Sequence, residues 1–190
     1  NPEGIIKNAN SRARTLEGLD DCSLLVHGSA PNTPLKVPMN GAIYMADLNF
    51  GQKTGLFYDQ RRNHAFLSSI SKNKTVLDVF SHVGGFALAA LVGGAVGATA
   101  VDGSQAALDL AQQGAEASGF KSALSIIKDD GFNALKCLRN EGKKFDIVIC
   151  DPPAFAPSRQ ALSSGLRAYE RLARISSGLV EERGTLVLCS

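Results

Sequence analysis

The sequence predicts an α/β fold: a doubly wound, mostly parallel sheet with a small β-rich hairpin region before it. From residue 75 onward, short and almost continuously apolar runs alternate with helical segments. This is the pattern of a parallel sheet covered on both faces. Before residue 50, β-type runs are broken by glycines and prolines, which is typical of hairpins. We therefore expect a β-rich lead-in over 1–50 and a core over 51–190.

The elements are expected in a simple order. In the lead-in, three short apolar runs predict strands at 23–27, 35–37 and 42–48. In the core, five apolar runs predict strands at 75–80, 98–102, 124–128, 145–150 and 185–189. Helices are expected at 85–92, 104–118, 132–141 and within 162–182. Ser104 is a natural N-cap, and Gly119 is a natural stop for that helix.

Composition excludes several classes of protein. The 190 residues carry a net charge of +2, with 44% apolar and 20% charged residues, which fits a globular domain rather than a disordered tail. Apolar runs such as 86–92 are shorter than the roughly 20 residues that span a bilayer. The four cysteines form no C-x-x-C pair, so we expect no metal site and no disulfide framework. A reducing, cytoplasmic compartment fits best.

The chain opens with Asn-Pro and stops directly after the last predicted strand, at Cys189-Ser190. Without a starting Met or a secretory signal, this suggests a fragment of a longer protein. The core is then expected to be truncated after its fifth strand.

Ligands of such sheets bind at the carboxyl ends of the strands, so the residues just past each strand carry the prediction. The first strand leads into Asp78-Val-Phe-Ser-His-Val-Gly-Gly-Phe86, whose glycines allow a tight turn. The dinucleotide pattern G-x-G-x-x-G is absent, and an acidic residue here suits a cationic amine. Asp102 ends the second strand and is placed to accept both hydroxyls of a ribose. A helix cap is the alternative for Asp102, although Ser104 already fills that role.

The remaining strand ends add polar and aromatic groups. Asp130 with Phe132 suits an adenine amino group and ring, and a solvated acidic turn is equally open. The run Asp151-Pro-Pro-Ala-Phe155 predicts a stiff loop with few backbone donors and an aromatic ring placed to stack. Cys189 is either a buried small hydrophobe or a nucleophile.

These motifs, in this order, resemble a class I S-adenosylmethionine-dependent methyltransferase with its Rossmann-like core. Three further stretches are similar to the bacterial 23S ribosomal RNA large-subunit cytosine-C5 methyltransferase family: 14–18, 49–61 and Asp151-Pro-Pro-Ala-Phe-Ala-Pro-Ser158. The resemblance runs from about Arg12 to Ser190. Relative to that family, the chain lacks the RNA-binding PUA domain and the C-terminal strands.

The resemblance implies S-adenosyl-L-methionine (SAM) as cofactor and ribosomal RNA, or another structured RNA, as partner. Cofactor-binding positions are then Gln60, Arg61, Asp78, Phe80, Gly84, Phe86, Asp102, Gly103, Ser104, Asp130, Gly131, Phe132 and Pro152. Substrate-binding positions are Lys53, Phe155 and Arg159. No membrane partner is implied. The oligomeric state stays open, with a homodimer as one option for the full-length protein.

The implied reaction is methylation of carbon 5 of a cytosine in ribosomal RNA. Cys189 stands at the position of the nucleophile that adds to carbon 6, and Asp151 is placed to bond the exocyclic amine. Phe155 would stack on the flipped base. A methyltransferase acting on a base nitrogen, without a cysteine nucleophile, is the first alternative. A non-catalytic RNA-binding module of the same fold is the second.

Overall fold

The computed structural model describes residues 2–7, 9, 14, 16–19, 24–48 and 55–189. The chain forms two compact units, each of which is described by itself. One comprises Asn1–Leu35 and Ala46–Phe57, and the other comprises Lys36–Met45 and Tyr58–Ser190. Within the described residues, every helix is too short or too polar to cross a membrane.

The smaller unit contains an antiparallel pair of strands, β1 (Gly4–Lys7) and β2 (Leu24–Gly28). Gly4 lies opposite Gly28, and the register shifts between Ile5 and Ile6. Every residue of β2 is exposed. Two strands alone bury little apolar surface.

A hairpin packs against the core of the larger unit. Strands β3 (Leu35–Met39) and β4 (Ala42–Ala46) pair across a two-residue turn at Asn40 and Gly41, both with positive φ, as type I′ turns require. The Ile43 N–H donates to Ser118 Oγ over 2.8 Å. Together with β1 and β2, the hairpin confirms the predicted β-rich lead-in.

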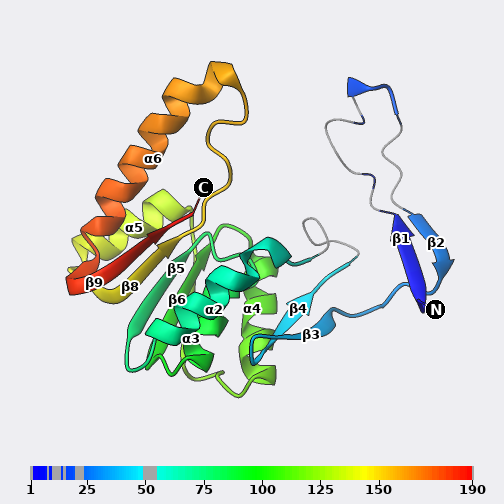
Figure 1. The fold of residues 1–190 in the computed structure, drawn as a ribbon, viewed down its shortest axis with the longest axis horizontal. Helices are drawn as coiled ribbons and strands as arrows, with labels where there is room; N and C mark the ends of the chain where they lie inside the picture. Colours follow the sequence, from blue (N-terminus) through cyan, green and yellow to red (C-terminus); the bar gives the residue numbers. More distant parts are fainter. Residues whose placement is uncertain are drawn as a thin grey trace. The chain divides into compact units, whose positions relative to one another are not determined.

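The larger unit is built on a five-stranded parallel sheet in the order β7-β6-β5-β8-β9 (Figure 1). Its strands are β5 (Thr75–Val79), β6 (Gly97–Asp102), β7 (Leu124–Lys128), β8 (Phe145–Cys150) and β9 (Val180–Leu188). The first strand in sequence, β5, therefore lies at the centre. The predicted doubly wound parallel sheet is confirmed.

Helices cover both faces of this sheet. They are α2 (Arg61–Ile70), α3 (Gly85–Val92), α4 (Gln105–Ala117), α5 (Gly131–Asn140) and α6 (Leu162–Ser177), with short 3-10 turns at Tyr58–Gln60 and Arg159–Ala161. Figure 1 shows α5 and α6 on one face and α2, α3 and α4 on the other. Leu77, Val148 and Leu172 are almost fully buried in the core under α5 and α6.

Strand β1 was not predicted, and two elements of the larger unit also differ from the sequence-based expectation. Helix α2 was not predicted, because only His64 and Leu67 of its ten residues are buried and the apolar periodicity is correspondingly weak. Strand β9 begins at Val180 rather than Thr185. Its first half carries charged, exposed residues, as suits the edge of a sheet, and includes Arg183 at φ 64°.

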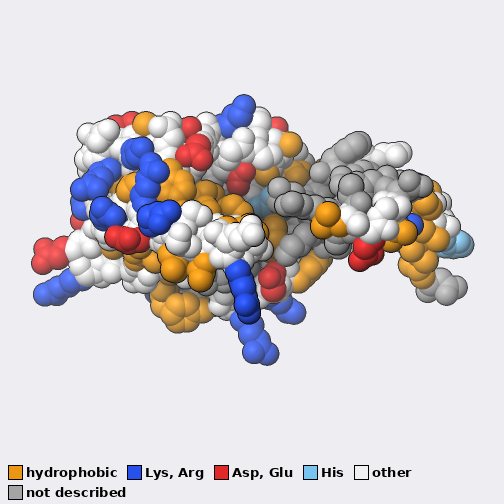
Figure 2. Space-filling view, turned by 90° about the horizontal axis from the view of Figure 1, so that it is seen from above, with side chains coloured by type: hydrophobic (Ala, Val, Ile, Leu, Met, Phe, Trp, Pro, Cys, Tyr) orange, Lys and Arg blue, Asp and Glu red, His pale blue; other side chains and the backbone are white. Residues whose placement is uncertain are grey.

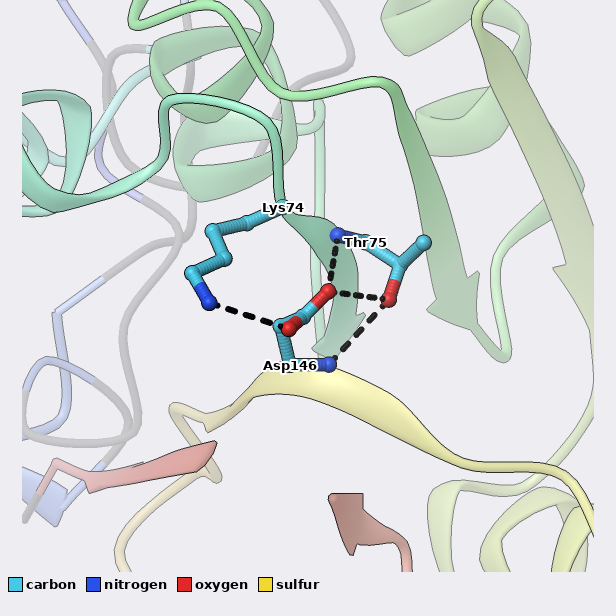
Figure 3. Close-up of polar contacts among 3 residues, drawn as sticks. All are labelled: Lys74, Thr75 and Asp146. Carbon is cyan, nitrogen blue, oxygen red and sulfur yellow. Dashed lines mark hydrogen bonds and ion pairs between the residues drawn. The ribbon is translucent and has the colours of Figure 1, made fainter. Parts of the chain in front are cut away.

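A polar cluster joins the amino ends of β5 and β8, away from the carboxyl edge (Figure 3). The Asp146 carboxylate accepts from the Thr75 N–H (2.9 Å), from Thr75 Oγ1 (3.0 Å) and from Lys74 Nζ (3.1 Å). Thr75 Oγ1 in turn accepts from the Asp146 N–H. These bonds lower the pKa of Asp146, the backbone N–H of Thr75 having the largest effect.

Candidate active site

The turn between β5 and α3 lies at the carboxyl edge of the sheet. Phe80, His82 and Gly84 all have positive φ, so the chain reverses within a few residues. At Gly84 the backbone is at φ 77°, and an added Cβ would lie 3.0 Å from the Ala111 Cβ. A glycine is needed there both for the conformation and for the close approach of α4.

Asp78 lies within the sheet directly below this turn and is fully buried. One carboxylate oxygen, Oδ2, accepts from the Ala87 N–H in the first turn of α3 (2.9 Å). Among the described residues, Oδ1 and the nearby buried Ser81 Oγ have no hydrogen-bond partner. Burial raises the pKa of Asp78 to about 7, and the charges of Asp151 and Asp102 act in the same direction.

Asp102 connects two loops at the end of β6. Oδ2 accepts from the His82 N–H and Oδ1 from the Ser104 N–H, both over 2.8 Å. Ser104 is the N-cap of α4 and accepts from the Ala107 N–H, as predicted. The carboxylate of Asp102 is thus held in place, and each oxygen keeps a further lone pair for a ligand hydroxyl.

Asp130 caps a helix. Its Oδ1 accepts from the Asn133 N–H over 3.0 Å at the start of α5, and the side chain is exposed. Asp129 reinforces the turn by accepting from Asn133 Nδ2 over 2.7 Å. The sequence analysis weighed a solvated turn against an adenine contact for Asp130. The cap is present, and the second carboxylate oxygen leaves the adenine contact open.

Aromatic rings gather at the same edge. The ring centroids of Phe132 and Phe155 are 5.7 Å apart, and that of Phe80 lies 6.4 Å from Phe132 and 6.5 Å from Phe155. Tyr169 of α6 follows at 4.8 Å from Phe155. Gly131 allows this packing, because an added Cβ would lie 2.6 Å from the Phe80 ring. The three rings predicted for cofactor and substrate, Phe80, Phe132 and Phe155, therefore form one aromatic cluster together with Tyr169, which was not predicted.

Asp151, at the end of β8, contacts residues from both ends of the larger unit. Gln60 Nε2 donates to Asp151 Oδ1 over 3.3 Å. The Cys189 N–H donates to the Cys150 carbonyl (2.9 Å), which places Cys189 beside the residue that precedes Asp151. Burial raises the pKa of Cys189 to about 11, and the charges of Asp151 and Asp78 act in the same direction. The thiol is therefore protonated at neutral pH.

Four further predicted site residues were assigned by the family resemblance. Lys53 is outside the described residues. Arg61 is exposed at the start of α2, with its carbonyl accepting from Asn40 Nδ2, and Arg159 is exposed in a short turn before α6. Phe86 is a buried residue of α3 and packs edge-on against His64, with centroids 4.5 Å apart.

Two groups next to the α3 turn escaped the sequence analysis. His64 is buried, and its Nδ1 has no hydrogen-bond partner among the described residues. Burial lowers the pKa of His64 to about 4, so the ring is neutral. Tyr44 stacks on it with centroids 6.1 Å apart and donates to the Gly85 carbonyl. A lone histidine on a polar helix gives no sequence signal for such a position.

The central β5 strand, the tight turn into α3 and the carboxylates at the ends of adjacent strands define a Rossmann-like domain of the class that binds nucleoside-containing cofactors. A family model described as S-adenosylmethionine-dependent methyltransferase matches residues 19–190. The chain belongs to this family of S-adenosylmethionine-dependent methyltransferases.

Two curated proteins are similar to this chain over nearly its whole length. The Ribosomal RNA large subunit methyltransferase I of Aeromonas salmonicida (strain A449) is 37% identical over 187 residues, which are 98% of this chain and 47% of that protein. The protein of the same name from Escherichia coli O139:H28 is 34% identical with the same coverage. The chain spans about half the length of these curated relatives.

A solved methyltransferase structure has a similar fold. The crystal structure of SMU.776 complexed with SAH matches with a TM-score of 0.77 at 30% identity, covering 87% of this chain and 44% of that one. The predicted fold class and the predicted dependence on SAM are confirmed.

The described residues fit SAM. Asp78 Oδ1 is a buried acceptor without a partner, and a buried polar atom of this kind calls for a donor, such as the ammonium group of the cofactor. Asp102 presents a fixed carboxylate for ribose hydroxyls. Phe132 offers a ring face for adenine.

Proposed function

We propose that this chain methylates carbon 5 of a cytosine in large-subunit ribosomal RNA, with Cys189 as the nucleophile. The observation that carries the proposal is the position of Cys189 at the carboxyl edge, where its N–H donates to the carbonyl of Cys150, the residue before Asp151. The matching relatives named Ribosomal RNA large subunit methyltransferase I support ribosomal RNA as the substrate. A cytoplasmic location accords with such a substrate.

In this proposal Asp78, Asp102 and Asp130 hold the amine, ribose and adenine of SAM, which supplies an activated methyl group on a sulfonium. Phe80, Phe132 and Gly131 border the adenine. The other proposed cofactor contacts are Gln60, Arg61, Gly84, Phe86, Gly103, Ser104 and Pro152. The main contribution of the chain is alignment of the donor with the acceptor atom.

Cys189 and Asp151 then prepare the base. Because the thiol is protonated at neutral pH, attack requires a proton acceptor, and we assign this role to the carboxylate of Asp151. The S–H bond breaks as sulfur bonds to carbon 6, and the proton moves to Asp151. The electrons of the carbon 5–carbon 6 double bond make carbon 5 nucleophilic. After methylation, a base takes the carbon-5 proton, the electrons of that C–H bond restore the double bond, and the expelled thiolate regains the proton held by Asp151.

The remaining proposed groups bind the RNA. Phe155 lies between Phe132 and Tyr169 in the aromatic cluster, and we propose that its ring stacks on a flipped base. Lys53 and Arg159 are proposed phosphate contacts. An alternative acceptor, a base nitrogen, needs no cysteine nucleophile, so a variant at Cys189 separates the two reactions.

The test uses RNA that carries 5-fluorocytidine, because fluorine cannot leave as a proton and the adduct with the protein persists. We expect a denaturant-resistant protein–RNA complex in the presence of SAM, and no complex with Cys189→Ala. Cys137→Ala is the matched control, since Cys137 is an exposed free cysteine in α5. Methylation of ordinary RNA by Cys189→Ala at the wild-type rate would overturn the cysteine mechanism and favour a base nitrogen.

A further inference from the structure

A row of arginines lies along the exposed side of α6. Arg167, Arg171 and Arg174 are all exposed, and spacings of four and three residues place them on one face of the helix. With Glu170 and Ile175 they line a shallow groove, which we call the α6 groove. Figure 2 shows basic side chains gathered around an apolar patch at the end of the molecule that carries α5 and α6.

The charge of the α6 groove is largely uncompensated. Arg174 Nη2 donates to Glu170 Oε1 over 3.1 Å, but both side chains are 70% exposed, and exposed pairs of this kind are weak. Within the described part of the chain, Arg167 forms no hydrogen bond or ion pair. Three cations therefore face one carboxylate.

The α6 groove adjoins the aromatic cluster. The guanidinium carbon of Arg171 lies 5.0 Å from the centroid of the Phe132 ring, and Phe132 neighbours Phe155. Arg171 thus belongs to the groove and also stacks on a ring of the proposed site. Nucleic acids offer both matching features, namely phosphates for the guanidinium groups and bases for the rings.

We propose that the α6 groove binds the sugar–phosphate backbone of the RNA strand that presents the target base. This rests on the proposed RNA methyltransferase function. At 1.5 Å per residue, the arginine row extends about 10 Å, comparable to the rise of about three nucleotides. The three guanidinium groups contact phosphates, while the aromatic cluster receives the base.

The experiment measures the affinity of the chain for a fluorescently labelled single-stranded RNA of mixed sequence across a salt series. For the triple variant Arg167→Gln, Arg171→Gln and Arg174→Gln, we expect at least about tenfold weaker binding and a salt slope lower by about 2, since each single-strand phosphate contact contributes about 0.7. The double variant Arg167→Gln and Arg174→Gln leaves the Arg171–Phe132 contact intact and should lower the slope by about 1.4.

Two further variants test whether a change in RNA affinity arises at the α6 groove itself. Glu170→Gln removes the only carboxylate that lines the groove, so it should tighten RNA binding. Lys72→Gln, Lys121→Gln and Lys143→Gln together remove the same charge at exposed positions before β5, β7 and β8, at the opposite edge of the sheet. This control should keep the wild-type slope, and unchanged SAM affinity shows that each variant is folded.

An unchanged affinity in the triple variant, or an equal loss in the lysine control, would overturn the α6 groove as the RNA-binding surface while leaving the proposed function standing. If the wild-type chain binds SAM but no RNA, both fail, and an acidic protein becomes the better partner for the groove. Tighter binding by Glu170→Gln together with weaker binding by the arginine variants supports the inference.

Discussion

Asp78 has two carboxylate oxygens in different surroundings, one bonded to the start of α3 and one without a partner among the described residues. Its pKa of about 7 lies above the ordinary value of 3.8. Ionisation of this group therefore progressively disfavours the folded, cofactor-free chain as the pH rises between these values. A bound cation next to the carboxylate offsets the free-energy cost of ionising Asp78. Cofactor binding and the ionisation of Asp78 should therefore be coupled.

Cofactor affinity should consequently depend on pH. We expect the affinity of the wild-type chain for SAM to rise with pH up to about 7, by at most about tenfold per pH unit, as Asp78 ionises. Asp78→Asn keeps the acceptor for the Ala87 N–H but removes the charge, so its affinity should be lower and independent of this titration. Calorimetry over a pH series measures both. The same pH profile in Asp78→Asn as in the wild type would remove Asp78 from the cofactor site.

The location of a single residue was predictable where it depends only on the order of strands and helices along the chain. The ends of parallel strands meet at one edge, so Asp78, Asp102 and Asp151 could be assigned to it from the sequence. The bond from Gln60 to Asp151 spans 91 positions and depends on where α2 packs. Tyr169 joins the aromatic cluster only because α6 returns over the loop after β8. Neither contact has a local sequence pattern.

At the scale of elements, the Asp146 cluster joins two neighbouring strands (Figure 3). Asp146→Ala leaves the Thr75 N–H and Oγ1 and the Lys74 ammonium without this acceptor, so we expect about 1–3 kcal/mol lower free energy of unfolding. Because the folded-state pKa of Asp146 is lowered, the wild-type advantage should be present at neutral pH and be lost as the pH falls below the ordinary value. Urea unfolding at two pH values measures this.

A matched control is available on the surface. Glu116 pairs with Lys121 over 2.8 Å, but their side chains are 61% and 73% exposed. Glu116→Ala should cost less than about 1 kcal/mol. If Asp146→Ala lowers the free energy of unfolding no more than Glu116→Ala does, the Asp146 cluster does not stabilise the pairing of β5 with β8.

Elements were predictable to the degree that their residues are buried. Helix α4 shows apolar residues at helical spacing because Leu108, Ala111 and Ala115 face the core, and its Ser104 cap was visible in the sequence. Strand β5 is buried over most of its length and has no polar face to obscure it. Helix α2 and the first half of β9 are exposed, and exposed elements leave weak patterns.

At the scale of the whole molecule, the strand order determines which strand-end carboxylates lie close together. A central β5 brings the turn into α3 next to the ends of β6 and β8, so carboxylates from three strands converge near one turn. This follows from the chain order and from right-handed crossovers, which is why the fold class was predictable. The division into two compact units depends on tertiary contacts that have no local sequence pattern, because one unit comprises both Asn1–Leu35 and Ala46–Phe57. The domain boundary expected at residue 50 stays a prediction.

The central claim is that this edge is a SAM site held by the strand-end carboxylates. The most direct test is calorimetric titration of the folded chain with SAM, with NADH as control ligand, for the wild type, Asp102→Ala and Asp109→Ala. Asp109 is an exposed carboxylate in α4 that bonds only Gln105 among the described residues. We predict SAM binding without NADH binding in the wild type, at least about tenfold weaker SAM binding in Asp102→Ala, the loss expected for a charge-assisted bond, and unchanged binding in Asp109→Ala. Binding of NADH, or equal SAM affinity in Asp102→Ala and the wild type, would contradict the account.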